Sequence, residues 1–200
     1  MSLFTSVRFL ASAHELSELP ADAGTEIAFA GRSNAGKSSA INALTRHKRL
    51  AFVSKTPGRT QTINYFSLGP DCFLADLPGY GYAAVPNEEK RNWAMLISTY
   101  LRSRQSLRGL IVVMDARRAF TTLDRQMLSW IAPLGKASHV LLTKADKLVR
   151  RDAITALAEA KSAANQFPDC TVQLFSATTR QGADEARGVI SEWLRYSSGP

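Results

Sequence analysis

The stretch GRSNAGKS, Gly31–Ser38, decides the fold of this 200-residue chain. It stands between the apolar run EIAFA and the segment KSSAINALT, which is expected to be helical. It satisfies G-x-x-x-x-G-K-[ST], a loop in which backbone N–H groups and the start of a helix surround phosphate. Lys37 would supply charge to the β- and γ-phosphates, and Ser38 would ligate Mg²⁺. The residues predicted to bind the phosphates are Gly31, Arg32, Ser33, Asn34, Ala35, Gly36, Lys37, Ser38 and Ser39.

Strand-like runs alternate with helical segments on both sides of this loop. The expected strands are 26–30, 63–68, 72–77, 110–115, 139–143 and 171–176, and the expected helices are 37–45, 88–104, 123–131, 150–165 and 183–196. The alternation predicts a doubly wound α/β fold, and with the phosphate loop after its first strand we expect a Ras-like P-loop NTPase. Its six-stranded, mostly parallel sheet would have one antiparallel edge strand and helices on both faces. The link 69–71 is too short for a parallel crossover, so its two strands should form an antiparallel hairpin. Residues 7–11 alternate except at Leu10, which indicates a further short edge strand.

Composition indicates one globular domain. Hydrophobic residues make up 45% of the chain and charged residues 21%, which allows a buried core and excludes a disordered chain. We expect the domain over residues 25–196, an extension packing on it over 1–24, and a tail over 197–200. No run approaches the ~18 apolar residues of a membrane span. Cys72 and Cys170 lack metal-ligand spacing, so we expect reduced thiols and a cytoplasmic location. No amphipathic membrane helix or lipidation motif supports membrane contact, so we expect none.

A carboxylate and a glycine follow the expected strand 72–77. In DLPG, Asp76 can hold Mg²⁺ through water, and Gly79 can turn its N–H toward a γ-phosphate. Alone this pattern is weak, but here it follows a phosphate loop that requires a metal aspartate. The predicted contacts in this segment are Asp76, Leu77, Pro78 and Gly79.

Two later strands end in sequences suited to guanine. In TKAD, the Asp146 carboxylate can accept two hydrogen bonds from guanine that adenine cannot supply, which predicts roughly 10⁴-fold discrimination. Lys144 can lie over the base, Thr143 can join this loop to the phosphate loop, and the backbone of FSA can donate to the guanine carbonyl. The predicted contacts are Thr143, Lys144, Ala145, Asp146, Phe175, Ser176 and Ala177. TKAD with FSA favours a GTPase over a nucleotide or nucleoside kinase.

The segment KTPGRTQT, Lys55–Thr62, is expected to move with the nucleotide state. Thr56, Thr60 and Thr62 are all candidate Mg²⁺ ligands. Thr60 is favoured because it follows Gly58 and precedes a strand. Its hydroxyl would complete the Mg²⁺ shell when a γ-phosphate is present. The predicted catalytic residues are therefore Lys37, Thr60 and Gly79.

The stretches GRSNAGKSSAINAL, KTPGRTQTINYF, DLPGYGYA, TKADK and FSA, in this order, resemble the EngB family of bacterial translation-factor-class (TRAFAC) GTPases. The resemblance runs from about Glu26 to Leu194. It implies GTP and GDP as ligands, assembly of the large ribosomal subunit as the role, and a link to cell division and septation. It implies Mg²⁺ on Ser38 and Thr60, with Asp76 acting through water. It adds GTP contacts from Gly58, Arg59, Thr60, Gln61 and Thr62. Ala35, Ala40 and Ala84 depart from the usual pattern.

Tyr80 occupies the position where Ras-like GTPases carry a water-positioning Gln. A phenol cannot orient water in that way, so we expect slow intrinsic hydrolysis. Asn34 is a candidate for holding K⁺ beside the phosphates. The alternative is that Asn merely tolerates the tight loop, and the sequence leaves both open.

The net charge of +8 suggests a polyanionic partner, although a basic surface without a partner is the alternative. The basic residues are concentrated at Arg46, Lys48, Arg49, Lys55, Arg59, Arg91, Arg102, Arg104, Arg108, Arg117, Arg118, Lys147, Arg150 and Arg151. We expect a footprint for RNA phosphates of the large-subunit precursor, without DNA binding, on a monomer. A regulatory GTP-binding module in division, without direct ribosome contact, is the alternative function.

Overall fold

A seven-stranded sheet runs through the computed structural model, which describes residues 3–51, 62–81 and 87–195. In chain order the strands are β1 (Arg8–Ala13), β2 (Thr25–Gly31), β3 (Ile63–Gly69), β4 (Cys72–Asp76), β5 (Leu107–Asp115), β6 (Ala137–Thr143) and β7 (Cys170–Leu174). In space their order is β1-β3-β4-β2-β5-β6-β7. Strand β3 is antiparallel to both its neighbours, and the remaining neighbours are parallel. The expected hairpin is thus β3–β4, and the predicted fold class is confirmed.

The predicted count of six strands is wrong by one. Strand β1 pairs with β3 from Arg8↔Ser67 to Ala13↔Ile63, so the antiparallel strand is not the outermost one. The register shifts between Phe9 and Ala11, and Leu10 is the extra residue. This bulge explains why Leu10 interrupts the alternation in the sequence. The outer edge of β3 gives the N-terminal segment a pairing partner, which local alternation does not specify.

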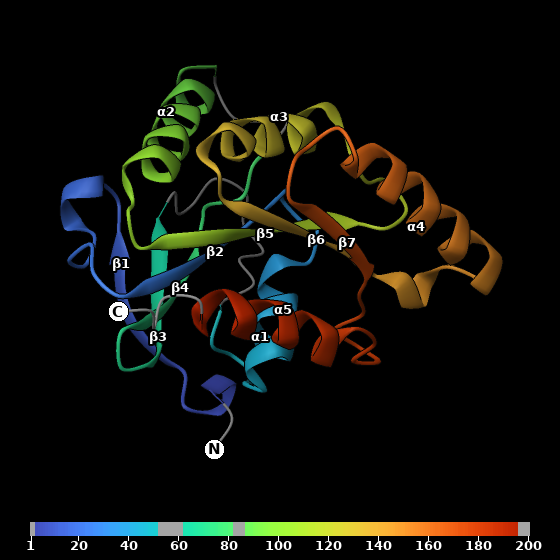
Figure 1. The fold of residues 1–200 in the computed structure, drawn as a ribbon, viewed down its shortest axis with the longest axis horizontal. Coiled ribbons are helices and arrows are strands. Elements are labelled where there is room, and N and C mark those ends of the chain that lie inside the picture. The colour runs from blue at the N-terminus through green and yellow to red at the C-terminus, as the bar shows by residue number, and fades with distance from the viewer. Residues whose placement is uncertain (1–2, 52–61, 82–86, 196–200) are drawn as a thin grey trace.

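Helices cover both faces of the sheet (Figure 1). Among the described residues they are α1 (Lys37–Thr45), α2 (Asn87–Ser103), α3 (Thr122–Ile131), α4 (Arg150–Ala164) and α5 (Ala183–Arg195), with 3₁₀ turns η1 (Leu3–Thr5), η2 (Leu16–Glu18), η3 (Ala132–Leu134) and η4 (Ala145–Lys147). Figure 1 shows α2, α3 and α4 on one face and α1 and α5 on the other. Each α-helix begins and ends within one residue of its expected bounds. No helix in the described ranges is long and apolar enough to cross a bilayer.

Successive side chains of β5 point to opposite faces of the sheet, and both faces are covered by helices (Figure 1). Leu110, Val112 and Met114 pack in the core beneath α2, α3 and α4. Ile111 and Val113 pack in the second core, with α1 and α5. A parallel strand covered on both faces has no side exposed to water, so every position favours an apolar side chain.

A buried carboxylate lies at the end of β2 opposite the phosphate loop. Glu26, fully buried at the start of β2, accepts hydrogen bonds from Tyr65 Oη at 2.9 Å, from Arg104 Nη2 at 2.9 Å and from Tyr100 Oη. A buried charge is stable only when it is paired and hydrogen-bonded. The prediction that Arg104 belongs to the basic surface is therefore wrong, because its side chain is buried to neutralise Glu26.

Candidate nucleotide-binding site

The phosphate loop lies where the chain connections diverge. It follows β2, which stands between β4 and β5, and the chain passes from β4 through α2 to β5 on the other side. Ligands of open α/β sheets bind at such a switch point. Gly36 precedes α1 with a φ of 97°, a left-handed conformation that glycine adopts readily. A Cβ at Gly31 would lie 2.8 Å from the Val113 carbonyl oxygen, so this position requires glycine as well.

Lys37 and Asp76 converge at the base of this loop. Lys37 Nζ donates to Asp76 Oδ1, and both side chains are largely buried. Ser38 follows in the first turn of α1. A hydroxyl and a carboxylate are oxygen donors of the kind that Mg²⁺ takes in proteins, so Ser38 and Asp76 fit the predicted metal.

The DLPG segment runs along the phosphate loop. Leu77 N donates to Phe29 O at 2.9 Å, Ser33 N donates to Tyr80 O at 2.7 Å, and Tyr80 N donates to Gly31 O at 3.3 Å. A Cβ at Gly79 would meet Gly31 O at 3.5 Å and Ser33 N at 3.6 Å. Gly79 is therefore packed against the phosphate loop.

The TKAD loop is fastened to the same phosphate loop. Thr143 Oγ1 donates to Ala35 O, and it also lies 3.0 Å from Met114 O. Lys144, in a left-handed conformation with a φ of 58°, donates from Nζ to Asn34 O at 2.7 Å. The loops predicted to bind base and phosphate thus form one continuous surface.

Asp146 and FSA lie side by side. Ser176 Oγ donates to Asp146 Oδ1 at 2.6 Å, and Ala145 N donates to Phe175 O at 3.2 Å. The Ser176 hydrogen bond lowers the pKa of Asp146 below its usual range, against a smaller opposing effect of burial. The carboxylate is therefore charged at neutral pH and can accept from a base.

Some predicted contacts lie outside the described residues or have other partners. Gly58, Arg59, Thr60 and Gln61 lie outside the described ranges. Thr62 is buried just before β3, with Oγ1 3.5 Å from Asn64 Oδ1. The Arg32 side chain donates from Nη2 to Arg118 O, in the turn before α3, at 2.8 Å. Asn34 has a φ of 62°, which Asn tolerates and which is enough to explain its presence in a tight loop.

Two acidic residues of the site were missed by the sequence reasoning. Asp115 Oδ2 lies 3.0 Å from Lys144 Nζ, and the carboxylate accepts from Arg117 Nε at 2.9 Å and Nη2 at 2.7 Å. Its pKa is held well below the usual range, chiefly by Arg117, although burial opposes this. Its place at the end of β5, beside the strand that ends in TKAD, is a signal that could have found it.

Asp124 is the second missed residue. It is fully buried in the first turn of α3 and accepts from the Tyr80 hydroxyl at 2.8 Å. Its sequence signal, Thr121 three residues earlier, predicts a helix cap and nothing about the nucleotide site.

The fold and these converging loops define a P-loop GTPase. The family described as 50S ribosome-binding GTPase matches residues 26–144, more than half of the chain. A probable GTP-binding protein EngB of Methylobacillus flagellatus is 56% identical over 195 residues, covering 97% of this chain and 94% of the relative. The protein of the same name in Burkholderia multivorans is 54% identical over 205 residues, covering 98% and 94%. The chain belongs to the EngB family of GTP-binding proteins.

Solved structures share the fold. A crystal structure of a probable GTP-binding protein EngB has a TM-score of 0.67 at 22% identity, covering 86% of this chain and 100% of the other. Era in complex with MgGDPNP and nucleotides 1506–1542 of 16S ribosomal RNA has a TM-score of 0.64 at 19% identity, covering 89% and 59%. At these identities the comparison establishes the common architecture.

Proposed function

We propose that this GTPase hydrolyses GTP slowly and acts as a nucleotide-controlled assembly factor for the large ribosomal subunit. The observation that carries the proposal is the place of the exposed basic residues relative to the nucleotide loops. Arg117 and Arg118 follow β5, and Lys147, Arg150 and Arg151 follow the TKAD loop after β6. All belong to loops or helix starts at the carboxyl ends of the strands, where the nucleotide motifs also lie. The description of the family as 50S ribosome-binding supports a ribosomal partner.

The residues of the site would divide the work on GTP. Lys37 and the N–H groups of residues 31–39 bind the phosphates, Gly79 contacts the γ-phosphate, and Asp146 selects guanine. Ser38 and Thr60 would hold Mg²⁺, with Asp76 acting through water, and the ion would neutralise charge that develops on the phosphates. Lys37 Nζ contacts Asp76, so its positive charge would lie beside the same phosphates.

Slow hydrolysis is supported by the position of Tyr80. The residue is 3% exposed, and its hydroxyl donates to Asp124 on α3. A side chain held in this way does not orient a water molecule for attack. We propose K⁺, held through Asn34 beside the phosphates, as one source of the positive charge that would stabilise the transition state. Hydrolysis should then be faster in KCl than in NaCl, and equal rates would exclude this role.

Binding to ribosomal particles tests the main proposal. We expect the protein to co-sediment with large-subunit precursors in the presence of a non-hydrolysable GTP analogue and not with GDP. Binding should weaken steeply with salt, because cations contacting phosphates displace bound counterions. Salt-insensitive binding would contradict an RNA-phosphate footprint.

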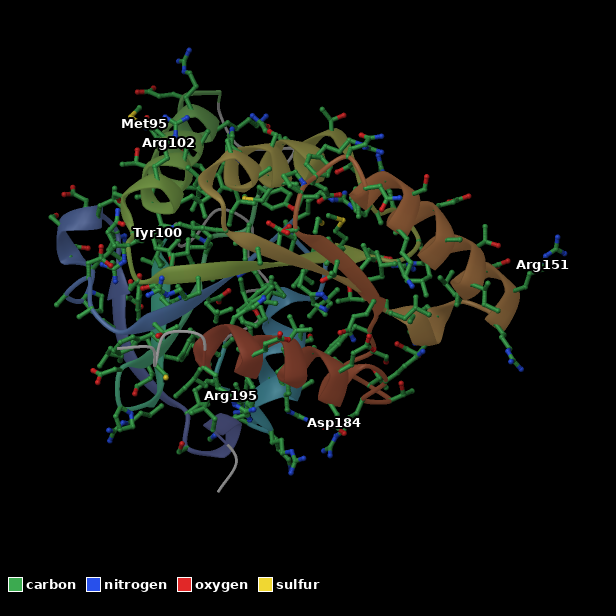
Figure 2. All side chains as sticks on the ribbon, in the orientation of Figure 1. Met95, Tyr100, Arg102, Arg151, Asp184 and Arg195 are labelled. Carbon is green, nitrogen blue, oxygen red and sulfur yellow. The ribbon has the colours of Figure 1, made fainter. Side chains whose placement is uncertain are left out.

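Two single substitutions on α4 locate the footprint. Arg151 stands at the outer end of α4 and points away from the molecule (Figure 2), while Lys161 is exposed in the last turn of the same helix. We expect Arg151→Ala to weaken binding and reduce the salt slope by about one, and Lys161→Ala to leave both unchanged. Equal effects would indicate a diffuse charge effect and contradict a localised footprint.

The alternative function is a regulatory GTP-binding module in division without direct ribosome contact. Failure to co-sediment in either nucleotide state, with GTP binding intact, would favour it. The link to septation, the monomeric state and the cytoplasmic location stay predictions from the sequence.

A further inference from the structure

Gly79 is flanked by two residues whose positions are set by different helices. On one side, Trp93 Nε1 on α2 donates to Pro78 O at 3.1 Å. On the other, the Tyr80 hydroxyl donates to Asp124 Oδ1 on α3 at 2.8 Å. Pro78 O belongs to the same peptide unit as the Gly79 N–H, so a rotation of that unit would move this oxygen away from Trp93, and Tyr80 is bonded directly to Gly79 on the other side.

The carboxylate that receives the Tyr80 hydroxyl is itself held firmly. Asp124 Oδ2 accepts from Thr121 N at 2.9 Å and from Thr121 Oγ1 at 2.7 Å, which closes the first turn of α3. Arg32 Nε, from the phosphate loop, lies 3.5 Å from the same oxygen. A fully buried carboxylate that loses a partner keeps the desolvation penalty of the unpaired oxygen, so the Tyr80 hydrogen bond has a substantial effect on local structure.

Aromatic rings join the same elements. The Tyr80 ring centroid lies 5.6 Å from that of Trp93 on α2, and Trp93 lies 5.9 Å from Trp130 on α3. These separations are within the range of favourable aromatic pairs. Tyr80, α2 and α3 therefore pack together beside the phosphate loop.

We propose that Tyr80 is a positioning residue: through Asp124 it holds the Gly79 amide in the orientation that recognises a γ-phosphate, and Trp93 does the same from α2 through Pro78. The consequence is that preference for GTP over GDP depends on the Tyr80 hydroxyl. The inference rests on the proposed function in one respect, the contact of Gly79 with the γ-phosphate.

A matched pair of tyrosines provides the test. Tyr80→Phe removes the hydroxyl bonded to Asp124, and Tyr65→Phe removes a hydroxyl bonded to Glu26 at 2.9 Å. Both are buried phenols that donate to a fully buried carboxylate, but Glu26 lies at the other end of β2 from the phosphate loop. Affinities for GDP and for a non-hydrolysable GTP analogue are measured for both variants and the parent.

We expect Tyr80→Phe to lower the ratio of analogue affinity to GDP affinity by about three- to tenfold, the effect of one hydrogen bond. GDP affinity should stay near the parental value, and Tyr65→Phe should leave the ratio unchanged. An unchanged ratio in Tyr80→Phe, or the same change in both variants, would overturn the inference, because a merely structural hydroxyl affects both nucleotides alike.

A second variant covers the case in which Tyr80→Phe does not fold. Trp93→Phe keeps an aromatic ring and removes the N–H that reaches Pro78 O. It should lower the same ratio, and no change in the ratio would overturn the inference. If the parent protein binds GDP and the analogue equally well, the γ-phosphate contact of the proposed function fails and the inference fails with it. If the parent discriminates and the variants do so equally, only the inference fails.

Discussion

Asp146 is the side chain that we propose selects guanine. The Ser176 hydrogen bond lowers the pKa of Asp146 from a range that already leaves the carboxylate charged at neutral pH, and burial opposes this. We predict that Asp146→Asn lowers GTP affinity by about 100-fold or more, because an amide cannot accept from both guanine N–H groups. XTP, which has a carbonyl in place of the amino group, should bind the variant better than GTP does. Competition titrations measure this, with Asp152→Asn on the exposed side of α4 as control. Unchanged GTP affinity would refute the assignment of Asp146 to the base.

Asp115 contacts Lys144, the residue that we propose lies over the base. The lysine amine lies between Asn34 O and Asp115 Oδ2, so the carboxylate determines where the lysine stem lies. We predict that Asp115→Asn weakens GTP and GDP binding together, by about three- to tenfold. The ratio of the two affinities should not change, which distinguishes this variant from Tyr80→Phe. Asp169→Asn, at an exposed turn before β7, is the control. A change confined to GTP would show that Asp115 acts elsewhere.

At the scale of single elements, we predict that substitution by alanine has opposite effects on stability at two glycines. A Cβ at Gly109 on β5 would overlap the ring of Trp193 on α5, whereas a Cβ at Gly188 on α5 meets nothing within 4 Å. We predict that Gly109→Ala lowers the free energy of unfolding by about 1–3 kcal/mol through overpacking. Gly188→Ala should raise it by about 0.5–1 kcal/mol, because alanine loses less backbone entropy in a helix. Urea unfolding of both variants checks this; destabilisation of both would contradict the open environment of Gly188.

At the scale of the whole molecule, a buried histidine makes stability depend on pH. His139 is a residue of β6 whose ring contacts β7, with Nδ1 2.6 Å from Thr171 Oγ1 and Nε2 2.8 Å from Gln173 Oε1. Burial lowers its pKa, and smaller effects of Gln173 and Glu185 oppose this. The unfolded chain therefore takes up the proton first as the pH falls. The contribution of His139 to stability is complete well above pH 6.5 and is lost progressively below it.

We predict that the free energy of unfolding falls between pH 7.5 and 5.5, by at most about 1.4 kcal/mol per pH unit from this residue. His139→Gln should unfold with a smaller dependence on pH over that interval. Urea unfolding at the two pH values measures the difference, and His14→Gln, at an exposed position, is the control. An equal slope in His139→Gln and the parent would show that other groups cause the dependence.

Much of the fold and of the candidate site could be predicted because the determining interactions are local. The helix bounds follow from apolar spacing and caps within each segment, and the β3–β4 hairpin follows from the short link between the two strands. The phosphate loop and TKAD were found because residues at fixed spacing follow strands. Their convergence follows from the parallel sheet, since strand ends that carry loops meet at one edge.

The sequence by itself determined the P-loop architecture, the order of the nucleotide motifs and the family, because each depends on residues within a few positions of one another. Only the tertiary structure decided that β1 pairs with β3, that Arg104 is buried against Glu26, and that Tyr80 donates to Asp124. Glu26 and Arg104 are 78 positions apart, and Tyr80 and Asp124 are 44 apart. The physical reason is that pairing of a strand edge or a buried charge depends on which distant groups the packed helices bring within hydrogen-bonding distance, and no local pattern records that choice.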